Sequence, residues 1–362
     1  MMIISNLSLL KKILLLFLVI VGIYFAKQFL MPICIGGILA TMFIPLCNWL
    51  EKRRFHKALA AFISLLMLLF VFGILVSLIS WKIAELLNDI SILKQKAIEI
   101  WNNTQEYIFN HLGVSVEKQS QILKAEQPSI GNIVQIVASS LTTLLANIIF
   151  VIAYFFFLLY SRAHIKAFFI KLIEPSQRSE MEKIVSSATK VSQQYLLGLS
   201  KMIVCLWIMY GIGFSLLGVE NAIFFAILCG LLEIVPFIGN ITGTTLTALI
   251  SALHGADFSI ILGIVITYFV IQFIQGWVLE PLILGPQVKI NPLFTIIALV
   301  LGEILWGIPG IILAIPMTAI IKIICDHIEQ LKPYGFLIGE PETEKNENSI
   351  VKKIKATLQI NK

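Results

Sequence analysis

Charged residues are scarce in this sequence: they make up 13% of its 362 residues, whereas hydrophobic residues make up 58%. A soluble domain has about 25% charged and about 45–50% apolar residues, so one buried core does not account for the apolar excess. A helix that crosses a bilayer needs about 20 mostly apolar residues, which leaves room for about eight such helices. We therefore predict an all-α, polytopic membrane protein, and we exclude a soluble enzyme, a nucleic-acid binder and a disordered chain.

Clusters of cysteine and histidine are also missing. The five cysteines and five histidines are scattered along the chain, and their spacing predicts neither a disulfide framework nor a zinc site. Signatures of catalysis are lacking too: the chain contains no G-x-x-x-x-G-K-S/T, no H-E-x-x-H and no G-x-S-x-G motif. We therefore expect neither an ATPase of its own nor another enzymatic activity, and no cofactor or metal ion.

The apolar residues are arranged in long runs. The first follows Lys11 and Lys12 and is not followed by a small-x-small cleavage site, so we interpret it as a retained first span. The last contains about 34 residues, which as one helix would extend about 50 Å, well beyond a hydrocarbon core of about 30 Å. Because Gly307, Pro309 and Gly310 interrupt it, we predict a re-entrant hairpin there. The runs cover residues 13–26, 29–47, 58–80, 139–160, 202–217, 222–238, 241–253, 258–279 and 292–325.

The net charge of +6 is concentrated in short loops beside these runs. Residues 48–57 carry four basic residues against one acid, and residues 161–201 carry seven against three. Residues 81–135 carry five lysines against six acids. The positive-inside rule places the two basic segments and the N-terminus in the cytoplasm and residues 81–135 outside. We place the polar C-terminal tail inside as well, and we expect the bilayer rather than nucleic acid as the partner.

Two further segments have helical periodicity without the length of an apolar span. The periodicity of residues 83–112 predicts an external amphipathic helix. The periodicity of the segment that begins near Ser179 predicts an amphipathic helical linker under the membrane. For both segments, simple packing against other helices is an alternative. The expected organisation is a three-span region (1–80), an external segment (81–138), a fourth span (139–160), a cytoplasmic linker (161–201), a transport core (202–330) and a cytoplasmic polar tail (331–362).

The helix-breaking and polar residues inside the C-terminal runs are the candidates for function. Proline removes a backbone donor and glycine weakens a helix, so we expect breaks at two places. Transporters use the helix ends that such breaks expose to bind solutes or ions. The residues concerned are Pro236, Gly239 and Asn240 at the first break and Gly307, Pro309 and Gly310 at the second.

Two acids fall within the same runs. A charged group at membrane depth costs at least about 2.5–3.5 kcal/mol unless it faces water or a partner, which makes Glu233 and Glu303 candidates for ion or proton coupling. The alternative is an acid at a cytoplasmic helix end, or one that is hydrogen-bonded between helices. Gln272 and Gln275 lie about one turn apart. They either line a polar path or form hydrogen bonds across helices.

Several motifs together resemble those of the autoinducer-2 exporter family of bacterial membrane proteins. They are Y-L-L-G at 195–198, P-F-I-G at 236–239, E-P-L-I-L-G-x-x-V-x-I-x-P at 280–292, W-G-I-P-G at 306–310 and a later proline. The resemblance is specific over residues 175–325 and extends to the layout of the preceding part. The residues that carry the later motifs are Glu280, Pro281, Gly285, Pro292, Trp306 and Pro316.

The resemblance implies a multispanning secondary transporter of the inner membrane, often homo-oligomeric. Some members resemble autoinducer-2 exporters and others sodium/proton antiporters. Asn240 stands where the family commonly has proline, and Leu199 stands where a glutamine often follows the glycine. Our first hypothesis is a secondary transporter of a small polar solute such as autoinducer-2. The alternatives are a monovalent cation/proton antiporter and, from another class, a non-transporting membrane scaffold that acts through residues 83–112.

Overall fold

The computed structural model describes residues 2–88, 147–236, 238–284 and 289–340, with scattered positions between 99 and 110. In this part of the chain the secondary structure is helical, apart from an isolated antiparallel bridge between Ile290 and Gly339. The all-α prediction is confirmed. Five of these helices are long and apolar enough to cross a membrane, or six if one bent pair counts as a single span. Two apolar stretches, Ala222–Leu232 and Pro292–Trp306, form shorter helices, so the described residues contain fewer full-length spans than eight.

The N-terminal part is built on three long helices and a fourth apolar one. Helices α1 (Met2–Phe25) and α2 (Lys27–Lys52) meet at a tight turn, and α3 (Lys57–Asn88) follows a short loop. The helix Asn147–Tyr160 packs against α2 so closely that the backbone of Gly36 lies beside that of Phe155. A cluster of buried side chains joins α2, α3 and the helix Asn147–Tyr160: Ala40, Phe43, Cys47, Leu50, Ala60, Ala61, Leu68, Phe155 and Leu159.

The two basic segments lie at the same end of these helices. Helix α7 (Arg162–Lys171) continues from Asn147–Tyr160 after a bend of 67°. At the bend the Arg162 guanidinium donates to Glu51 Oε1 at 2.6 Å and to Asn48 Oδ1 at 3.2 Å. This contact brings the loop after α2 and the start of α7 to one side of the molecule.

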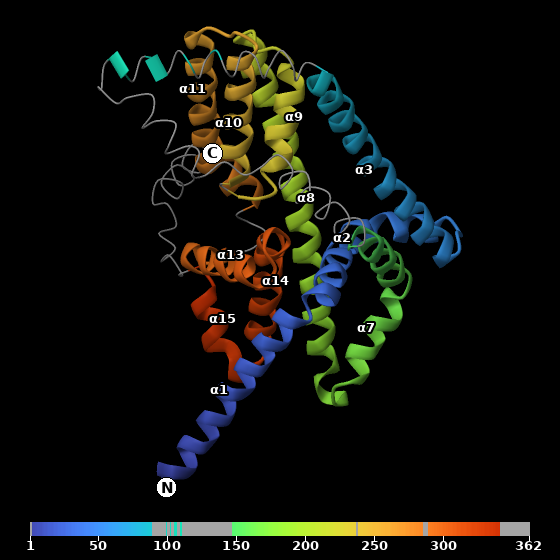
Figure 1. The fold of residues 1–362 in the computed structure, drawn as a ribbon. Coiled ribbons are helices and arrows are strands. Elements are labelled where there is room, and N and C mark those ends of the chain that lie inside the picture. Colours follow the sequence, from blue (N-terminus) through green and yellow to red (C-terminus); the bar gives the residue numbers. More distant parts are fainter. Residues whose placement is uncertain are drawn as a thin grey trace, which may run out of the picture.

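Helix α8 (Arg178–Leu216) connects the two parts of the molecule. It follows a short 3₁₀ turn, η1 (Pro175–Gln177), and contains 39 residues, which correspond to about 58 Å at 1.5 Å per residue. The amphipathic linker and the apolar span expected after it are therefore one continuous helix, and its charged residues lie between Arg178 and Lys201. In Figure 1, α8 runs the height of the molecule, and it packs on α2, α9, α11 and α14.

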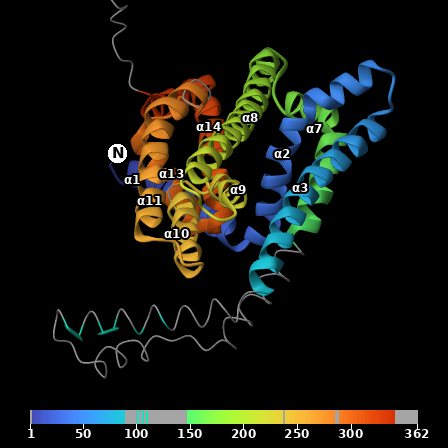
Figure 2. The ribbon, with the colours of Figure 1, turned by 90° about the horizontal axis from the view of Figure 1, so that it is seen from above.

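Beside the second half of α8 stands a group of three helices. They are α9 (Ala222–Leu232), α10 (Ile238–Leu253) and α11 (Phe258–Ile274), and the last continues as the π-helix η2 (Gln275–Leu284). Figures 1 and 2 show these helices side by side with α8. Helix α9 is about 16 Å long, which is too short to cross a hydrocarbon core of about 30 Å.

Helices α9 and α10 therefore form a helical hairpin, which matches the broken helix expected in this region. Its two arms are in backbone contact at glycines. A Cβ atom on Gly239 would collide with the carbonyl oxygen of Leu232, and one on Gly243 would lie 2.9 Å from Cys229 Sγ. Larger side chains at either glycine would push the arms apart.

The last part of the described chain folds as a second hairpin. Helices α13 (Pro292–Trp306) and α14 (Ile308–His327) cross at Gly302 and Gly310, where a Cβ on either residue would collide with the other's carbonyl. Gly307 joins them with φ +65° and ψ −144°, a region of backbone conformation that is essentially restricted to glycine. The break predicted in the last apolar run is thus present, and the two helices on either side of it form a hairpin.

The first residues of the expected polar tail form a short helix. After the 3₁₀ turn η3 (Glu329–Leu331), α15 (Lys332–Ile338) packs on α14. The Asn291 N–H donates to the Ile338 carbonyl at 2.8 Å, which attaches the end of α15 to the segment before α13. Most of the expected external helix 83–112, Gly285 and residues 341–362 lie outside the described residues.

Candidate functional site

The tip of the α9–α10 hairpin places an acid between helices. Helix α9 tightens at its end, where the N–H groups of Ile234 and Val235 donate three residues back, to Leu231 and Leu232. Pro236 cannot donate a backbone hydrogen bond, and the chain turns there. Glu233 is the C-cap residue of α9, so its side chain projects from the hairpin tip into the group of helices.

The side chains around this tip form one hydrogen-bonded network. Tyr210 on α8 donates to Asn240 Oδ1 at 3.2 Å. The Asn240 amide nitrogen donates to Gln272 Oε1 at 2.6 Å and to Gln275 Oε1 at 3.3 Å. The Gln275 amide nitrogen donates in turn to Glu233 Oε1 at 2.6 Å. We call these five residues, contributed by α8, α9, α10 and the α11–η2 helix, the tip network.

The side-chain amides of Asn240 and Gln275 each donate both of their N–H hydrogens within this region. A carboxamide has two N–H donors, and those of Asn240 reach Gln272 and Gln275. One donor of Gln275 bonds to Glu233 Oε1, and the other points to Glu280 Oε1 at 3.4 Å. The other carboxylate oxygen, Glu233 Oε2, is buried and has no hydrogen-bond partner in the described part of the chain. Within the tip network, Glu233 Oε2 is therefore the buried acceptor that is open to a further hydrogen bond.

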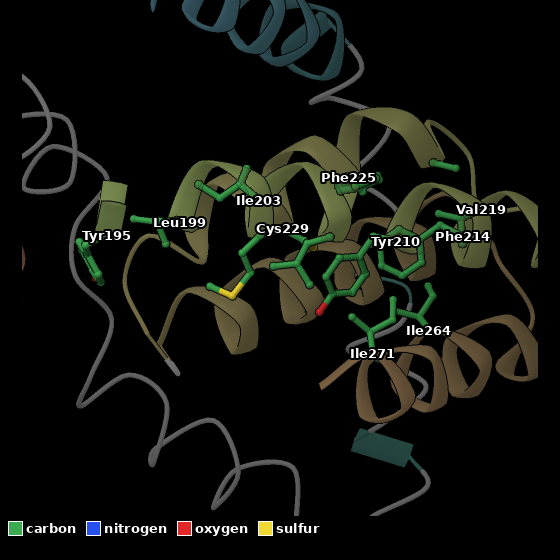
Figure 3. Close-up of a cluster of buried hydrophobic side chains, with 14 residues drawn as sticks. Tyr195, Leu199, Ile203, Tyr210, Phe214, Val219, Phe225, Cys229, Ile264 and Ile271 are labelled. Carbon is green, nitrogen blue, oxygen red and sulfur yellow. The ribbon is translucent and has the colours of Figure 1, made fainter. Parts of the chain in front are cut away.

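The tip network lies deep among apolar side chains. Tyr210, Asn240 and Gln275 are 0% exposed and Glu233 is 4% exposed. Figure 3 shows the surrounding cluster, in which residues of α8, α9 and α11 converge around the Tyr210 ring. Burial of a polar group without a partner costs about 1–3 kcal/mol, so an unpartnered carboxylate oxygen at this depth indicates a site for a ligand, a proton or water.

The change from α-helix to π-helix positions the two glutamines. Helix α11 ends at Ile274, and η2 begins at Gln275; segments of π-helix are frequent at functional sites. The same element brings two motifs together, because a Cβ on Gly198 would lie 3.2 Å from the Ile283 carbonyl oxygen. The Y-L-L-G motif of α8 thus packs directly on the segment that follows Pro281.

The second group of predicted residues lies elsewhere. Glu303 is exposed on α13, which packs on α14, α1 and α2. The Trp306 indole donates to the Ile23 carbonyl at 3.2 Å and so ties α13 to α1. Pro292 starts α13 after an Asn291 cap, Pro309 lies in the first turn of α14, and Pro316 is buried within α14. The structure therefore brings Glu233, Asn240, Gln272, Gln275 and Glu280 together, and it places Glu303 and Gly307 on a different hairpin.

Some polar residues of this region were not predicted from the sequence. Tyr210 is one, since a tyrosine in an apolar span gives no signal of its partner. Ser251 of α10 is another, and it is buried together with Thr244 and Thr247, which the sequence shows as polar residues of the same apolar run. With Asn240 they follow a spacing of four, three and four residues, which is the period of one helix face; that regularity could have identified them.

Metal-ligating side chains do not gather at this site. Among the described residues there is no group of three or more His, Cys, Asp or Glu side chains that could hold a metal ion. The five cysteines are free thiols.

Comparison with known proteins gives a consistent picture. A family model described as "AI-2E family transporter" matches residues 13–330. Relatives named "Putative transport protein" include YueF of Bacillus subtilis, 24% identical over 83% of this chain and 84% of its own length. YhhT of Escherichia coli K12 is 21% identical over 92% of this chain and 95% of its own length. YrrI of Bacillus subtilis is 31% identical over 36% of this chain, and the match spans 37% of that protein.

The match from residue 13 to residue 330 includes both hairpins, α8 and the tip network. It covers a family of multi-pass membrane transporters and not a family of catalytic enzymes. On this basis the chain belongs to the AI-2E family of transporters.

Proposed function

We propose that this protein is a secondary transporter of a small polar solute, such as autoinducer-2, across the bacterial inner membrane. The observation that carries the proposal is the tip network, a buried set of linked amide, phenol and carboxylate groups with one open acceptor. Such groups recognise a solute with several hydroxyls, because each hydroxyl both donates and accepts. A site lined by hydrogen-bonding groups also rejects apolar solutes, which would leave those groups unpartnered.

The two hairpins are the moving parts in this proposal. The α9–α10 tip carries the binding groups, including Pro236, Gly239 and Asn240. The α13–α14 hairpin, with its break at Gly307, Pro309 and Gly310, would open the opposite side in the alternate state. Both hairpins have closely packed backbones at glycines, which supports their movement as units.

A second candidate is a monovalent cation/proton antiporter, favoured by the open oxygen of Glu233. A buried carboxylate that exchanges a proton for a cation needs one oxygen held in place and another free to bind. Glu233 has this arrangement, because Gln275 donates to Oε1. Glu303 is the other candidate coupling residue, and its exposure on α13 gives it a secondary place.

The supporting test is transport by purified protein in proteoliposomes. We expect autoinducer-2 flux to fall sharply in Asn240→Leu and in Glu233→Gln, and to persist in Thr245→Val, which changes an exposed side chain of the same helix. A sodium-driven pH change inside the vesicles, lost in Glu233→Gln, would favour the antiporter. Wild-type protein that moves neither autoinducer-2 nor protons would contradict both and favour the scaffold alternative.

Orientation and assembly are parts of the same proposal. We infer that both termini and the two basic segments are cytoplasmic, and that the transporter is a homo-oligomer. The contact between Arg162 and Glu51 supports a common side for residues 48–57 and 161–201. Cysteine accessibility at each terminus and the mass of the detergent-solubilised protein would test these points.

A further inference from the structure

The short connection between α2 and α3 is strongly basic. Lys52, Arg53, Arg54 and Lys57, here called the basic turn, fall within six residues, and all four are exposed. The helical segments on either side are long and apolar enough to cross a membrane, and they end at Lys52 and begin at Lys57. The basic turn therefore lies where the chain leaves the bilayer and re-enters it, at the depth of the phospholipid headgroups. Figures 1 and 2 both show this turn at the edge of the molecule.

The acid next to the basic turn already has a partner. Glu51 is the one acid of residues 48–57, and its Oε1 accepts from the Arg162 guanidinium at 2.6 Å. Because Arg162 comes from another helix, its contact keeps Glu51 from neutralising the cations beside it. Within the described part of the chain, none of the four side chains of the basic turn forms an ion pair or a hydrogen bond. Their positive charges are therefore available to a partner outside the protein.

The side chain of Arg53 is held in a position from which it can donate. Its guanidinium carbon lies 4.2 Å from the centroid of the Trp49 ring, which is a cation–π contact. Stacking uses the face of the guanidinium and leaves its five N–H donors free in the plane of the group. A planar fork of donors matches two oxygens of a phosphate. The Trp49 ring is itself 49% exposed, and tryptophan is enriched at the membrane–water interface.

The backbone of the turn is held without help from these side chains. The N–H groups of Arg53 and Phe55 both donate to the Leu50 carbonyl, at 2.9 and 3.2 Å. Arg54 has φ +68°, in the left-handed region that residues with a side chain rarely adopt. Basic side chains can also cap the last carbonyls of a helix, but backbone N–H groups fill that role here. The arginine side chains are thus free for binding.

We propose that the basic turn binds the headgroup of an anionic phospholipid, with Arg53 and Arg54 at the phosphate and with Lys52 and Lys57 beside it. The placement at headgroup depth favours a lipid as the partner, and the four unpaired cations favour a lipid of net negative charge. A zwitterionic headgroup presents the same phosphate together with a cation, which the basic turn repels. This inference goes beyond the proposed function, because it concerns the lipid and not the solute.

Trp49 is a native reporter for this contact, because it lies one turn inside the end of α2 and stacks on Arg53. The full chain contains six tryptophans, and the test uses a form in which the other five are replaced by phenylalanine. It is reconstituted in phosphatidylcholine vesicles that contain a minor fraction of brominated phosphatidylglycerol or of brominated phosphatidylcholine with the same chains. Bromine quenches tryptophan fluorescence on contact. The ratio of the two quenching curves gives the preference for the anionic lipid, corrected for the exposure of Trp49.

Each Lys or Arg near an anionic membrane surface contributes about 1 kcal/mol, which is about fivefold in affinity. We expect phosphatidylglycerol to be preferred over phosphatidylcholine by at least about twentyfold. Arg53→Gln combined with Arg54→Gln should lower the preference by about twentyfold, and Arg53→Lys should lower it less, since it keeps the charge. The matched control is Lys27→Gln: Lys27 lies 5.3 Å from the Tyr24 ring centroid at the other end of α2, and its loss should leave the preference unchanged.

Equal quenching of Trp49 by the two brominated lipids would overturn the proposal, and so would a preference that survives the double glutamine change. A further arm adds inorganic phosphate at constant ionic strength. The preference should persist, whereas its loss would identify a site for a soluble anion and overturn the lipid assignment. Each variant is first checked for a single, monodisperse elution peak and for unchanged quenching by brominated phosphatidylcholine, which shows that the turn still lies against lipid. The readout needs no flux, so its result is separate from that of the transport assay.

Discussion

The two clusters of buried side chains differ in what they enclose. The N-terminal cluster, around Phe43 and Phe155, contains apolar residues and one hydrogen-bonded pair, Cys47 with Ser64. The C-terminal cluster, around Tyr210 and Phe225, is equally buried but borders the tip network and the buried hydroxyl residues of α10. The two regions therefore differ in buried polarity, and the polar groups of the C-terminal region are the candidates for function.

The largest expected difference between the two regions concerns Gln275. The Gln275→Leu change leaves Glu233 Oε1 without its partner and removes one of the two acceptors of Asn240; an unsatisfied buried polar group costs about 1–3 kcal/mol, and more when it is charged. We expect solute flux to become undetectable and the thermal midpoint in detergent to fall. The matched N-terminal change, Ser64→Ala, should leave flux at its wild-type rate. Flux in Gln275→Leu equal to wild type would remove the distinction between the regions.

The next effect is expected when a large side chain of the N-terminal cluster is truncated. Phe155 is fully buried and contacts Phe43 edge to face, with ring centroids 5.3 Å apart. Phe155→Ala should lower the free energy of unfolding by about 3–5 kcal/mol, measured by denaturant titration in detergent. The protein that remains folded should transport at the wild-type rate per molecule, and a specific loss of turnover would show that this cluster is also part of the mechanism.

A smaller effect is expected from alanine at the hairpin glycines. Gly239→Ala introduces a methyl group against the Leu232 carbonyl, whereas Gly73→Ala on α3 meets no atom within 4 Å. We expect the first to lower the free energy of unfolding by about 1–3 kcal/mol, as overpacking does. The second should raise it slightly, since alanine favours a helix over glycine by about 1 kcal/mol. Equal thermal midpoints for both variants would show that the hairpin tip is loosely packed.

The smallest effect should come from the ion pair between Arg162 and Glu51. Both side chains are partly exposed, at 18% and 25%, and such pairs contribute about 0–1 kcal/mol. Arg162→Gln should therefore change the thermal midpoint little and the flux not at all. A large loss of either would indicate that the basic end has a further role, for example in orientation during insertion.

The sequence was most informative about the helix breaks, where proline and glycine restrict or free the backbone. Pro236 with Gly239, and Gly307 with Gly310, predicted the two breaks, because proline removes a donor and glycine permits close approach and positive φ. Gln272 and Gln275 were expected to line a polar path or to bond across helices, and the structure shows bonds across helices to Asn240 and Glu233.

The sequence did not show which helices pack against one another. Periodicity shows which face of a helix is apolar but not which element covers it, so Tyr210 could not be joined to Asn240. For the same reason Glu303 and Glu233 looked equivalent as buried acids, although one is exposed on α13 and the other is enclosed. The continuity of α8 was also missed, because its first half is polar enough to be taken for a linker.

That continuity has a mechanical consequence. Helix α8 touches α2 of the N-terminal part and also packs on α9, α11 and η2, so a movement of α8 would be felt by both parts of the molecule. If it tilts as a rod of about 58 Å, a rotation of about 5° about its first turn displaces its far end by about 5 Å, close to one helical turn. A small adjustment at the charged start of α8 is thereby magnified into a shift large enough to change which groups meet at the joint with α9.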